Sequence, residues 1–374
     1  MKALALPEAW YAVKEVASIP SPALLVYPER IRHNIAEMLK IAGDPNRLRP
    51  HIKTHKTAEI VKLQQEMGID KFKCATIAEA ELLGRCKAKD VLLAYQPVGP
   101  DPERLLQLQQ EFPDTSFSAL VDHLEVLKNL ERVAGNQKSV FRLFLDLNTG
   151  MNRTGIIPGQ EAEDLYIRMV KSPFIEACGL HAYDGHIRDT PFDARKASSD
   201  AAFSKVTALK DSLTSKGYTV PEIIAGGSPT FPVHALRPEV TLSPGTTLLW
   251  DARYAELFPD MHFLPAAVLL SRVVSMPSAN TVCLDLGHKA IAPEMEFPRV
   301  YLTGWEDCDQ IGQSEEHLVL SCSTTANRKI GQTVYGIPMH ICPTVAKYPE
   351  LLVIESGQVT GTWKVAARDY KLNF

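Results

Sequence analysis

From residue 23 to residue 242 the chain alternates short apolar runs with amphipathic stretches, and this alternation limits its fold more than any other feature. Residues 29–42, for example, carry apolar side chains at helical spacing, at Ile31, Ile35, Met38 and Leu39. We predict strands at residues 23–27, 47–53, 72–75, 91–95, 117–121, 140–147, 175–182, 223–225 and 239–242. Repeated βα units predict a parallel sheet, and about eight of them predict an α/β fold closed into a (β/α)8 TIM-type barrel.

After residue 255 the pattern changes to short segments rich in β-branched residues and separated by turn signals, at residues 266–276, 281–286, 300–305, 317–321 and 351–358, with no convincing helix. Such segments predict a mostly antiparallel β domain. We therefore assign residues 22–255 to the barrel, and residues 1–21 and 256–374 to the β domain.

The composition is that of a soluble globular protein, with 45% hydrophobic and 22% charged residues among 374. A formal net charge of −4 gives no field for a polyanion, and no stretch reaches the roughly 20 apolar residues of a membrane span. We expect neither nucleic acid nor a membrane as a partner. Seven widely spaced cysteines predict reduced thiols and a cytoplasmic location, with Cys283, Cys308 and Cys322 as packing residues.

The segment from Arg49 to Lys56 packs two histidines and two lysines around one bend, and Lys53 stands where a parallel strand ends. Enzymes with this architecture place their chemistry at that edge. Desolvation and neighbouring cations lower the pKa of a lysine, and its neutral amine can form a Schiff base. The alternative is a basic cluster that binds an anion or is simply solvated.

Two further motifs follow predicted strands. In the turn Asp146–Gly155 two glycines permit a tight path, so Arg153 can donate to a phenolate or carboxylate oxygen. In the next motif, alternation places His181 and Tyr183 on one face of a strand; a tyrosine can hydrogen-bond a ring nitrogen, and His186 can serve as acid or base. A structural ion pair or a satisfied structural group is the alternative reading of each.

Two glycine-rich turns follow the last two predicted barrel strands. The first contains Gly226, Gly227 and Ser228, and the second contains Gly245 and Thr246. Backbone N–H groups in such turns cradle phosphate, and barrels commonly bind phosphate at this position. Any tight loop, however, can also contain two glycines.

In the β domain, His340 and Cys342 stand two residues apart, so an extended backbone would aim both side chains to one side. Imidazole with thiolate is a pair that prefers zinc, and two protein ligands leave positions open for water and substrate. By itself, a His-x-Cys pair is usually a chance occurrence.

Together these motifs resemble the D-threonine aldolase and D-serine dehydratase family of alanine-racemase-like, fold-type III pyridoxal-phosphate enzymes. The resemblance runs from Ile19–Pro22 through Arg49–Lys56 to His340–Thr344. It implies a head-to-tail homodimer with active sites between subunits, which binds pyridoxal 5'-phosphate and a divalent metal (zinc, manganese or magnesium).

The resemblance also implies a role for each motif. Lys53 would form the Schiff base, Arg153 would touch the phenolic oxygen of the cofactor, and Tyr183 would meet its pyridine nitrogen. The two glycine-rich turns would bind the phosphate, and His340 with Cys342 would hold the metal.

Two activities on β-hydroxy D-amino acids are open. We expect an aldolase that cleaves D-threonine or a similar substrate to glycine and an aldehyde, with His186 as the base, because residues 183–186 resemble aldolases. The alternative is a dehydratase that converts D-serine or 3-hydroxyaspartate to a 2-oxo acid and ammonia, the branch that the His-x-Cys pair resembles. A racemase needs no metal, so the pair argues against that class, and a cofactor carrier would lack the β domain.

Overall fold

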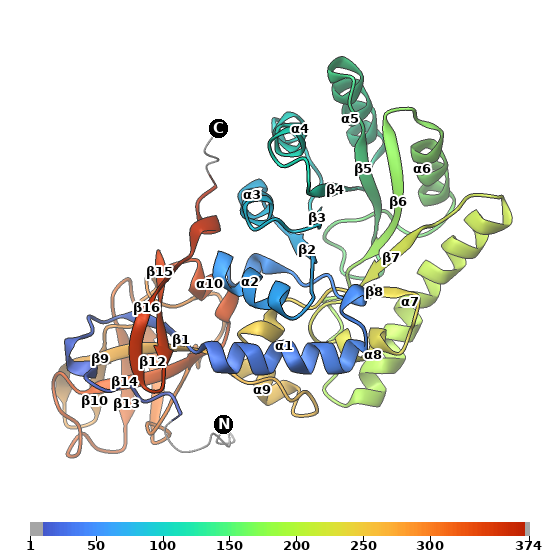
Figure 1. Cartoon of the computed structure of the whole chain (residues 1–374). Helices are drawn as coiled ribbons and strands as arrows, with labels where there is room; N and C mark the ends of the chain where they lie inside the picture. The colour runs from blue at the N-terminus through green and yellow to red at the C-terminus, as the bar shows by residue number, and fades with distance from the viewer. Residues whose placement is uncertain (1–9, 371–374) are drawn as a thin grey trace. The chain divides into compact units, whose positions relative to one another are not determined.

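The structure is a computed structural model that describes residues 10–370 (Figure 1). These residues form two compact units. The barrel unit comprises Met38–Lys53, Val61–Gly245 and residues 369–370, and the sheet unit comprises residues 10–37, Thr54–Ile60 and Thr246–Arg368. The boundaries predicted from the sequence at residues 22 and 255 stay predictions.

The barrel unit is built on parallel strands that pair in the order in which they occur along the chain. These strands are β2 (Lys71–Cys74), β3 (Asp90–Leu93), β4 (Ser116–Val121), β5 (Phe141–Leu147), β6 (Ile175–Ala182), β7 (Glu222–Ala225) and β8 (Val240–Leu242). The intervening helices are α3 (Ile77–Arg85), α4 (Asp101–Glu111), α5 (Leu124–Gln137), α6 (Gln160–Lys171), α7 (Phe192–Ser215) and α8 (Phe231–Ala235). Helices α1 (Pro28–Ala42) and α2 (Ala58–Glu66) have residues in both units.

The eighth strand position is filled by the short segment 48–51, which we call the closing segment. Leu48 bridges to Leu242 on β8, and His51 bridges to Lys73 on β2, both in parallel orientation. Pro50 has no N–H to donate, so this segment makes isolated bridges where a strand was predicted over residues 47–53. The predicted fold class is nevertheless confirmed. The parallel strands β2 to β8 alternate with helices, and the two edge strands, β2 and β8, both pair with the closing segment.

The core of the barrel unit consists of apolar side chains on neighbouring strands. Leu92, Leu120, Phe144, Cys178 and Ile224 form one buried cluster. Most residues of these strands are buried whichever way they point. Strands covered on both faces read as continuous apolar runs, which is why they were readable from the sequence.

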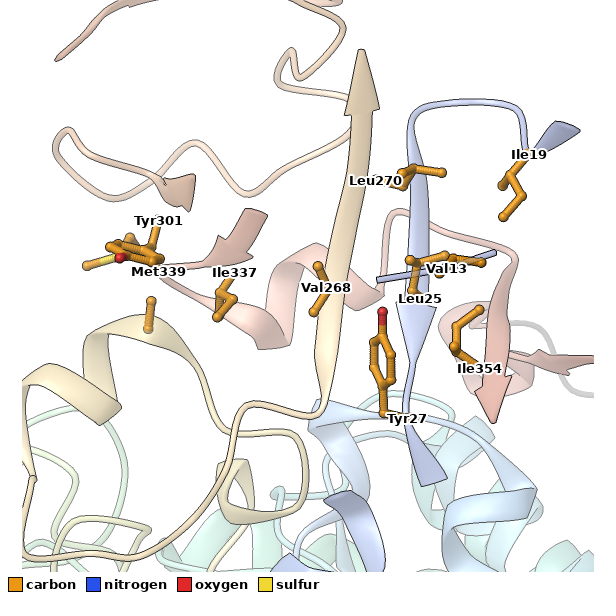
Figure 2. Packing of buried hydrophobic residues seen from close by; sticks show 11 residues of the cluster. Val13, Ile19, Leu25, Tyr27, Val268, Leu270, Tyr301, Ile337, Met339 and Ile354 are labelled. Atoms are coloured by element: carbon orange, nitrogen blue, oxygen red, sulfur yellow. The ribbon is translucent and has the colours of Figure 1, made fainter. Parts of the chain in front are cut away.

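The sheet unit holds a mixed, mostly antiparallel sheet of nine strands. Its strands are β1 (Ala23–Val26), β9 (Ala267–Ser278), β10 (Thr281–Leu284), β11 (Val300–Leu302), β12 (Cys308–Gln313), β13 (Leu318–Cys322), β14 (Thr333–Pro338), β15 (Glu350–Glu355) and β16 (Gln358–Lys364). Figure 2 shows part of its core, where Leu25 of β1 packs with Val268 and Leu270 of β9 and with the ring of Tyr27.

Strand β1 corrects one prediction. The strand forms, but it pairs antiparallel with β9 and parallel with β15, and so lies outside the barrel sheet. A four-residue apolar run fits either sheet equally well, and its true partners lie more than 200 residues further along the chain. Local pattern therefore predicted the strand but not its sheet.

Three other predictions in the C-terminal region were wrong or incomplete. Helix α10 (Ile341–Val345) lies where no helix was expected, and strands β12, β14 and β16 were not predicted. Cys308 and Cys322, expected as reduced packing residues, form a disulfide between paired strands β12 and β13. In residues 10–370, no helix has the length and apolar character needed to cross a bilayer.

Candidate active site

Lys53 stands in a 3-10 turn, Ile52–Thr54, directly after the closing segment. Its backbone N–H donates to Nδ1 of His51 over 3.3 Å. Two residues before His51, the fully buried Arg49 donates to Asp90 at 2.6 Å and to Glu222 at 3.3 Å. The closing segment is thus tied to β3 and β7 by a buried cation, which fixes the backbone that carries Lys53.

The ring of Tyr183 gathers three cationic side chains. Nζ of Lys53 and Nζ of Lys73 each lie 5.8 Å from its centroid, and Cζ of Arg153 lies 5.2 Å from it. These distances are within the range of cation–π attraction. The structure therefore brings together three residues that the motifs singled out, Lys53, Arg153 and Tyr183, and adds Lys73.

The first glycine-rich turn packs directly against Tyr183. A Cβ on Gly227 would come within 3.0 Å of Cε2 of that ring, and Gly226 has a φ of +87°, which favours glycine. The two turns also meet, because the N–H of Gly245 donates to Oγ of Ser228 at 3.2 Å. Thr246 belongs to the sheet unit. The predicted phosphate cradle therefore has four of its five residues together in the barrel unit.

Asp184 is a buried carboxylate that directly follows Tyr183 and binds the first glycine-rich turn. It had no predicted role. It accepts from the N–H of Gly227 at 3.1 Å, from Oγ1 of Thr230 at 2.7 Å and from Nε2 of His234 at 2.8 Å. Arg237 donates to Nδ1 of His234 at 2.8 Å, which leaves Nε2 as the protonated nitrogen. Burial raises the pKa of Asp184, but the hydrogen bonds, above all from His234, outweigh it and lower the pKa.

This network changes the expected roles within the phosphate cradle. The N–H of Gly227 is already engaged by Asp184, so it positions the turn and does not point freely at an anion. The sequence did contain a signal for this, since Asp184 directly follows Tyr183 and Thr230 ends the glycine-rich turn.

His186 is exposed and lies against the turn that carries Arg153. A Cβ on Gly150 would approach Nε2 of His186 to 2.6 Å, so the imidazole occupies space that only a glycine leaves open. Asp122 stabilises the same turn, because it accepts a hydrogen bond from the N–H of Gly155 at 2.8 Å. The candidate base, His186, therefore contacts the turn that carries the candidate arginine, Arg153.

His181 is held by a buried carboxylate. Its Nδ1 bonds to Asp146 at 2.7 Å inside the barrel, and Asp146 also accepts from Gln96 at 2.9 Å. Burial lowers the pKa of His181, although Asp146 opposes the shift. His181 is therefore a satisfied structural group, which was its alternative reading.

In the sheet unit, His340 and Cys342 lie close together, but not on an extended segment. His340 is the N-cap of α10 and Cys342 is in its first turn, so a helix brings the side chains together. Nδ1 of His340 bonds to Glu294 at 2.5 Å, and Sγ of Cys342 lies 3.1 Å from Oγ1 of Thr54. Burial lowers the pKa of His340, but Cys342 and then Glu294 outweigh it and raise the pKa to about 9.

The pair fits part of a metal site by its donor chemistry. One nitrogen and one sulfur suit zinc, and a metal ion would displace the proton that His340 holds. In the part of the chain that the structure describes, no group of three or more His, Cys, Asp or Glu residues is arranged around one ion position. His340 and Cys342 would then be two protein ligands, with water or substrate completing the shell.

The barrel unit fits pyridoxal phosphate. Lys53 supplies an amine and Arg153 a guanidinium at the ring of Tyr183, which carries a hydroxyl, and the first glycine-rich turn lies beside that ring. The close approach of Gly227 to the tyrosine ring would be lost with any larger residue, so the turn is shaped to lie against that ring.

Comparison with known proteins adds two family models and several relatives. The model described as alanine racemase, N-terminal domain, matches residues 26–251, and the putative serine dehydratase domain matches residues 266–354. A 3-hydroxy-D-aspartate aldolase of Paracoccus denitrificans (strain Pd 1222) is 25% identical, over 94% of this chain and 93% of the relative. A D-serine dehydratase of Dictyostelium discoideum is 24% identical, over 94% of this chain and 97% of the relative.

The solved structure of a D-threonine aldolase from Filomicrobium marinum superposes with a TM-score of 0.87 at 25% identity. The match covers 94% of this chain and 96% of that chain. The names of these relatives divide between aldolases and dehydratases, and at such identities they do not choose between the two activities.

Proposed function

Because the chain belongs to the alanine racemase N-terminal domain family and continues into a serine dehydratase domain, as its motifs predicted, we propose that it is a pyridoxal-phosphate- and divalent-metal-dependent lyase of β-hydroxy D-amino acids. The proposed reaction is retro-aldol cleavage of D-threonine, or a similar substrate, to glycine and an aldehyde. The main support is the convergence of the Lys53 and Arg153 side chains on the ring of Tyr183.

Each residue of the barrel unit then has a defined task. Lys53 would bind the cofactor through its amine, Arg153 would donate to the phenolic oxygen, and the hydroxyl of Tyr183 would meet the pyridine nitrogen. Ser228 and the two glycine-rich turns would hold the phosphate. The bound cofactor withdraws electrons from the α-carbon of the substrate, which is the chemistry that the protein alone lacks.

The choice of cleavage over elimination depends on a base for the β-hydroxyl group. His186 supports the aldolase reading, because it is exposed and stands beside the turn of Arg153. An imidazole can act as a general base toward a hydroxyl group. A divalent ion at His340 and Cys342 would supply Lewis-acid polarisation of an oxygen.

The second candidate is a dehydratase, and one observation favours it. The proposed metal pair contains the thiolate Cys342, as the resemblance to the dehydratase branch implies, and a relative of equal coverage is named a D-serine dehydratase. In that reaction Lys53 would remove the α-proton, and His186 would have no essential part.

Product analysis separates the candidates. Purified protein is given D-threonine or D-serine in the presence of cofactor, with zinc, manganese or magnesium in turn, and with EDTA as the metal-free control. Glycine and acetaldehyde from D-threonine support the aldolase. Pyruvate and ammonia from D-serine, without glycine from D-threonine, support the dehydratase, and inversion of configuration without breakdown supports a racemase.

Two further proposals concern the protein in the cell. We propose a homodimer, as the family resemblance implies, and sedimentation of the cofactor-bound protein tests it. The cytoplasmic location predicted from the sequence also stays a prediction.

A further inference from the structure

Lys73 is a buried lysine that the proposed function does not use. It lies on β2 and only 2% of its surface is exposed. Lysine is rarely buried in this way unless its charge is paired. Lys71, two residues earlier on the same face of the strand, is more exposed and provides a natural comparison.

Backbone pairing brings Lys73 to Lys53. The bridge between His51 and Lys73 aligns β2 with the closing segment, and Lys53 follows that segment by two residues. Both amines consequently lie at the same distance, 5.8 Å, from the centroid of the Tyr183 ring. The barrel unit therefore holds two amines at one tyrosine ring, near enough for the charge of Lys53 to act on Lys73, and only one of them has a task.

Among residues 10–370, no hydrogen bond or ion pair reaches the amine of Lys73. The charged and titratable groups that surround it are Lys53, Arg49, Arg153, Asp146, Asp184 and His181. The two carboxylates are already engaged, Asp146 by His181 and Asp184 by His234. The amine of Lys73 therefore makes no ion pair within the described part of the chain, and the charges of Asp146 and Asp184 only partly oppose the effects of burial and of Lys53.

The electrostatics follow from this arrangement. Burial, and after it the neighbouring charge of Lys53, lower the pKa of Lys73 to about 7. A group with such a pKa gains and loses its proton near neutral pH. Loss of the positive charge on Lys53 removes a repulsion, and the pKa of Lys73 then rises.

We propose that Lys73 is a second functional amine of this site, which accepts the proton that Lys53 must lose before its nitrogen attacks an aldehyde. The inference rests on the proposed function only for the identity of that aldehyde, pyridoxal phosphate. Its geometric basis is the pair of amines at one tyrosine ring, with no partner for Lys73.

The step balances without any other reactant. One N–H bond of the Lys53 ammonium breaks, and its proton forms a new N–H bond on the neutral amine of Lys73. The freed lone pair of Lys53 forms a C–N bond with the aldehyde carbon. The carbon–oxygen double bond of the aldehyde breaks and a carbon–nitrogen double bond replaces it. The oxygen takes the two protons that remain on the Lys53 nitrogen and leaves as water, and no electrons are gained or lost overall.

The test compares Lys73→Met and Lys73→Arg with wild type and with the control Lys71→Met, in the full-length chain after removal of cofactor. The probe is isotopically labelled formaldehyde with cyanoborohydride, at pH 7 and pH 9. Mass spectrometry then measures how fast Lys53 is methylated. The rate of pyridoxal phosphate binding, followed by absorbance, is a second readout.

We expect methylation of Lys53 at pH 7 to slow by about tenfold or more in both Lys73 variants, since a general base contributes at least this much. At pH 9, where hydroxide replaces the missing base, the difference should shrink, and Lys71→Met should match wild type. Arginine keeps a positive charge but cannot accept a proton at these pH values. A slow Arg variant therefore identifies proton transfer, and not charge, as the cause.

Two results would overturn the proposal. The first is an unchanged rate of Lys53 methylation in both variants. The second is slow methylation in Lys73→Met but a wild-type rate in Lys73→Arg, which would mean that Lys73 acts only through its charge. A third outcome separates this inference from the proposed function. If methylation of Lys53 by formaldehyde is slower in the Lys73 variants but wild-type protein does not bind pyridoxal phosphate, this inference stands and the proposed function fails.

Discussion

Single side chains around Tyr183 explain most of the proposed chemistry, and each acts at a different atom. Lys53 reaches the ring from the closing segment, and Arg153 reaches it from the turn after β5. His186 touches that same turn at Gly150, outside the ring of cations. Because these side chains come from separate segments of the chain, each can be replaced singly, and each makes its own prediction.

Replacement of His186 by alanine tests the proposed base. We expect cleavage of D-threonine to fall by about 10²-fold or more, because a positioned base contributes that much. Cofactor absorbance should be unchanged, since His186 is not a predicted cofactor ligand. The kinetics are measured as kcat against pH for both proteins. Full activity in the variant would remove His186 from the mechanism and favour the dehydratase.

Replacement of His340 by alanine tests the metal pair. We expect the variant to bind pyridoxal phosphate normally but to lose affinity for zinc and to lose turnover. Metal binding is measured by titration calorimetry, and turnover in EDTA-treated samples to which metal is restored. His288→Ala, a partly exposed histidine elsewhere in the sheet unit, is the control. Undiminished turnover of the His340 variant without metal would exclude the site from the reaction.

At the scale of elements, Asp184 connects the strand end that carries Tyr183 to the glycine-rich turn. Its hydrogen bonds to Gly227, Thr230 and His234 make one rigid unit of two segments more than 40 residues apart. The cradle for phosphate is thus positioned by a buried carboxylate and completed by backbone groups.

Asp184→Asn should loosen this cradle. Loss of charged hydrogen bonds costs about 1.5–3 kcal/mol, so we expect affinity for pyridoxal phosphate to fall by roughly tenfold to a hundredfold. Equilibrium dialysis of cofactor measures the change. The exposed residue Asp189 gives the control, Asp189→Asn, which should bind like wild type. Equal affinity in all three proteins would contradict the positioning role.

The same carboxylate makes stability depend on pH. The pKa of Asp184 is lowered in the folded protein, so its contribution to stability is complete above the unfolded value of about 3.9 and disappears as the pH falls through the folded value. Denaturant titrations between pH 6 and pH 3 should therefore show a steeper loss of unfolding free energy for wild type than for Asp184→Asn. Parallel curves would indicate that Asp184 is not held as an anion.

The sequence predicted the elements of the barrel well because buried parallel strands appear as uninterrupted apolar runs. Strand β6 was predicted with its observed bounds, and the other barrel strands lie within two residues of theirs. It also predicted that Lys53, Arg153 and Tyr183 would meet, because parallel strands end at one edge. Helix α10 was missed because five residues that include Pro343 are too short to show a helical period.

Two features of the site were not readable in the same way. Lys73 was not among the residues that the motifs singled out, and only the structure shows that it is buried beside Tyr183. Asp184 was visible in its motif, but its partners Thr230 and His234 follow β7, so no local pattern joined them. Contacts between distant segments, and burial itself, are what sequence patterns report least.

At the scale of the whole molecule, the chain joins a barrel that fits a carbonyl cofactor to a sheet unit that carries the proposed metal pair, His340 and Cys342. The family models cover both parts in the same order. Everything proposed about the reaction depends on one covalent link in the barrel unit, that between the Lys53 amine and pyridoxal phosphate. That link can be tested without knowing the substrate.

The most direct measurement is borohydride reduction of the cofactor-bound protein, followed by digestion and mass spectrometry. The account predicts a pyridoxyl-phosphate adduct on the peptide that contains Lys53, and loss of the absorbance near 420 nm that the family resemblance implies in Lys53→Ala. An adduct on Lys73 or on any other lysine, with Lys53 unmodified, would contradict it.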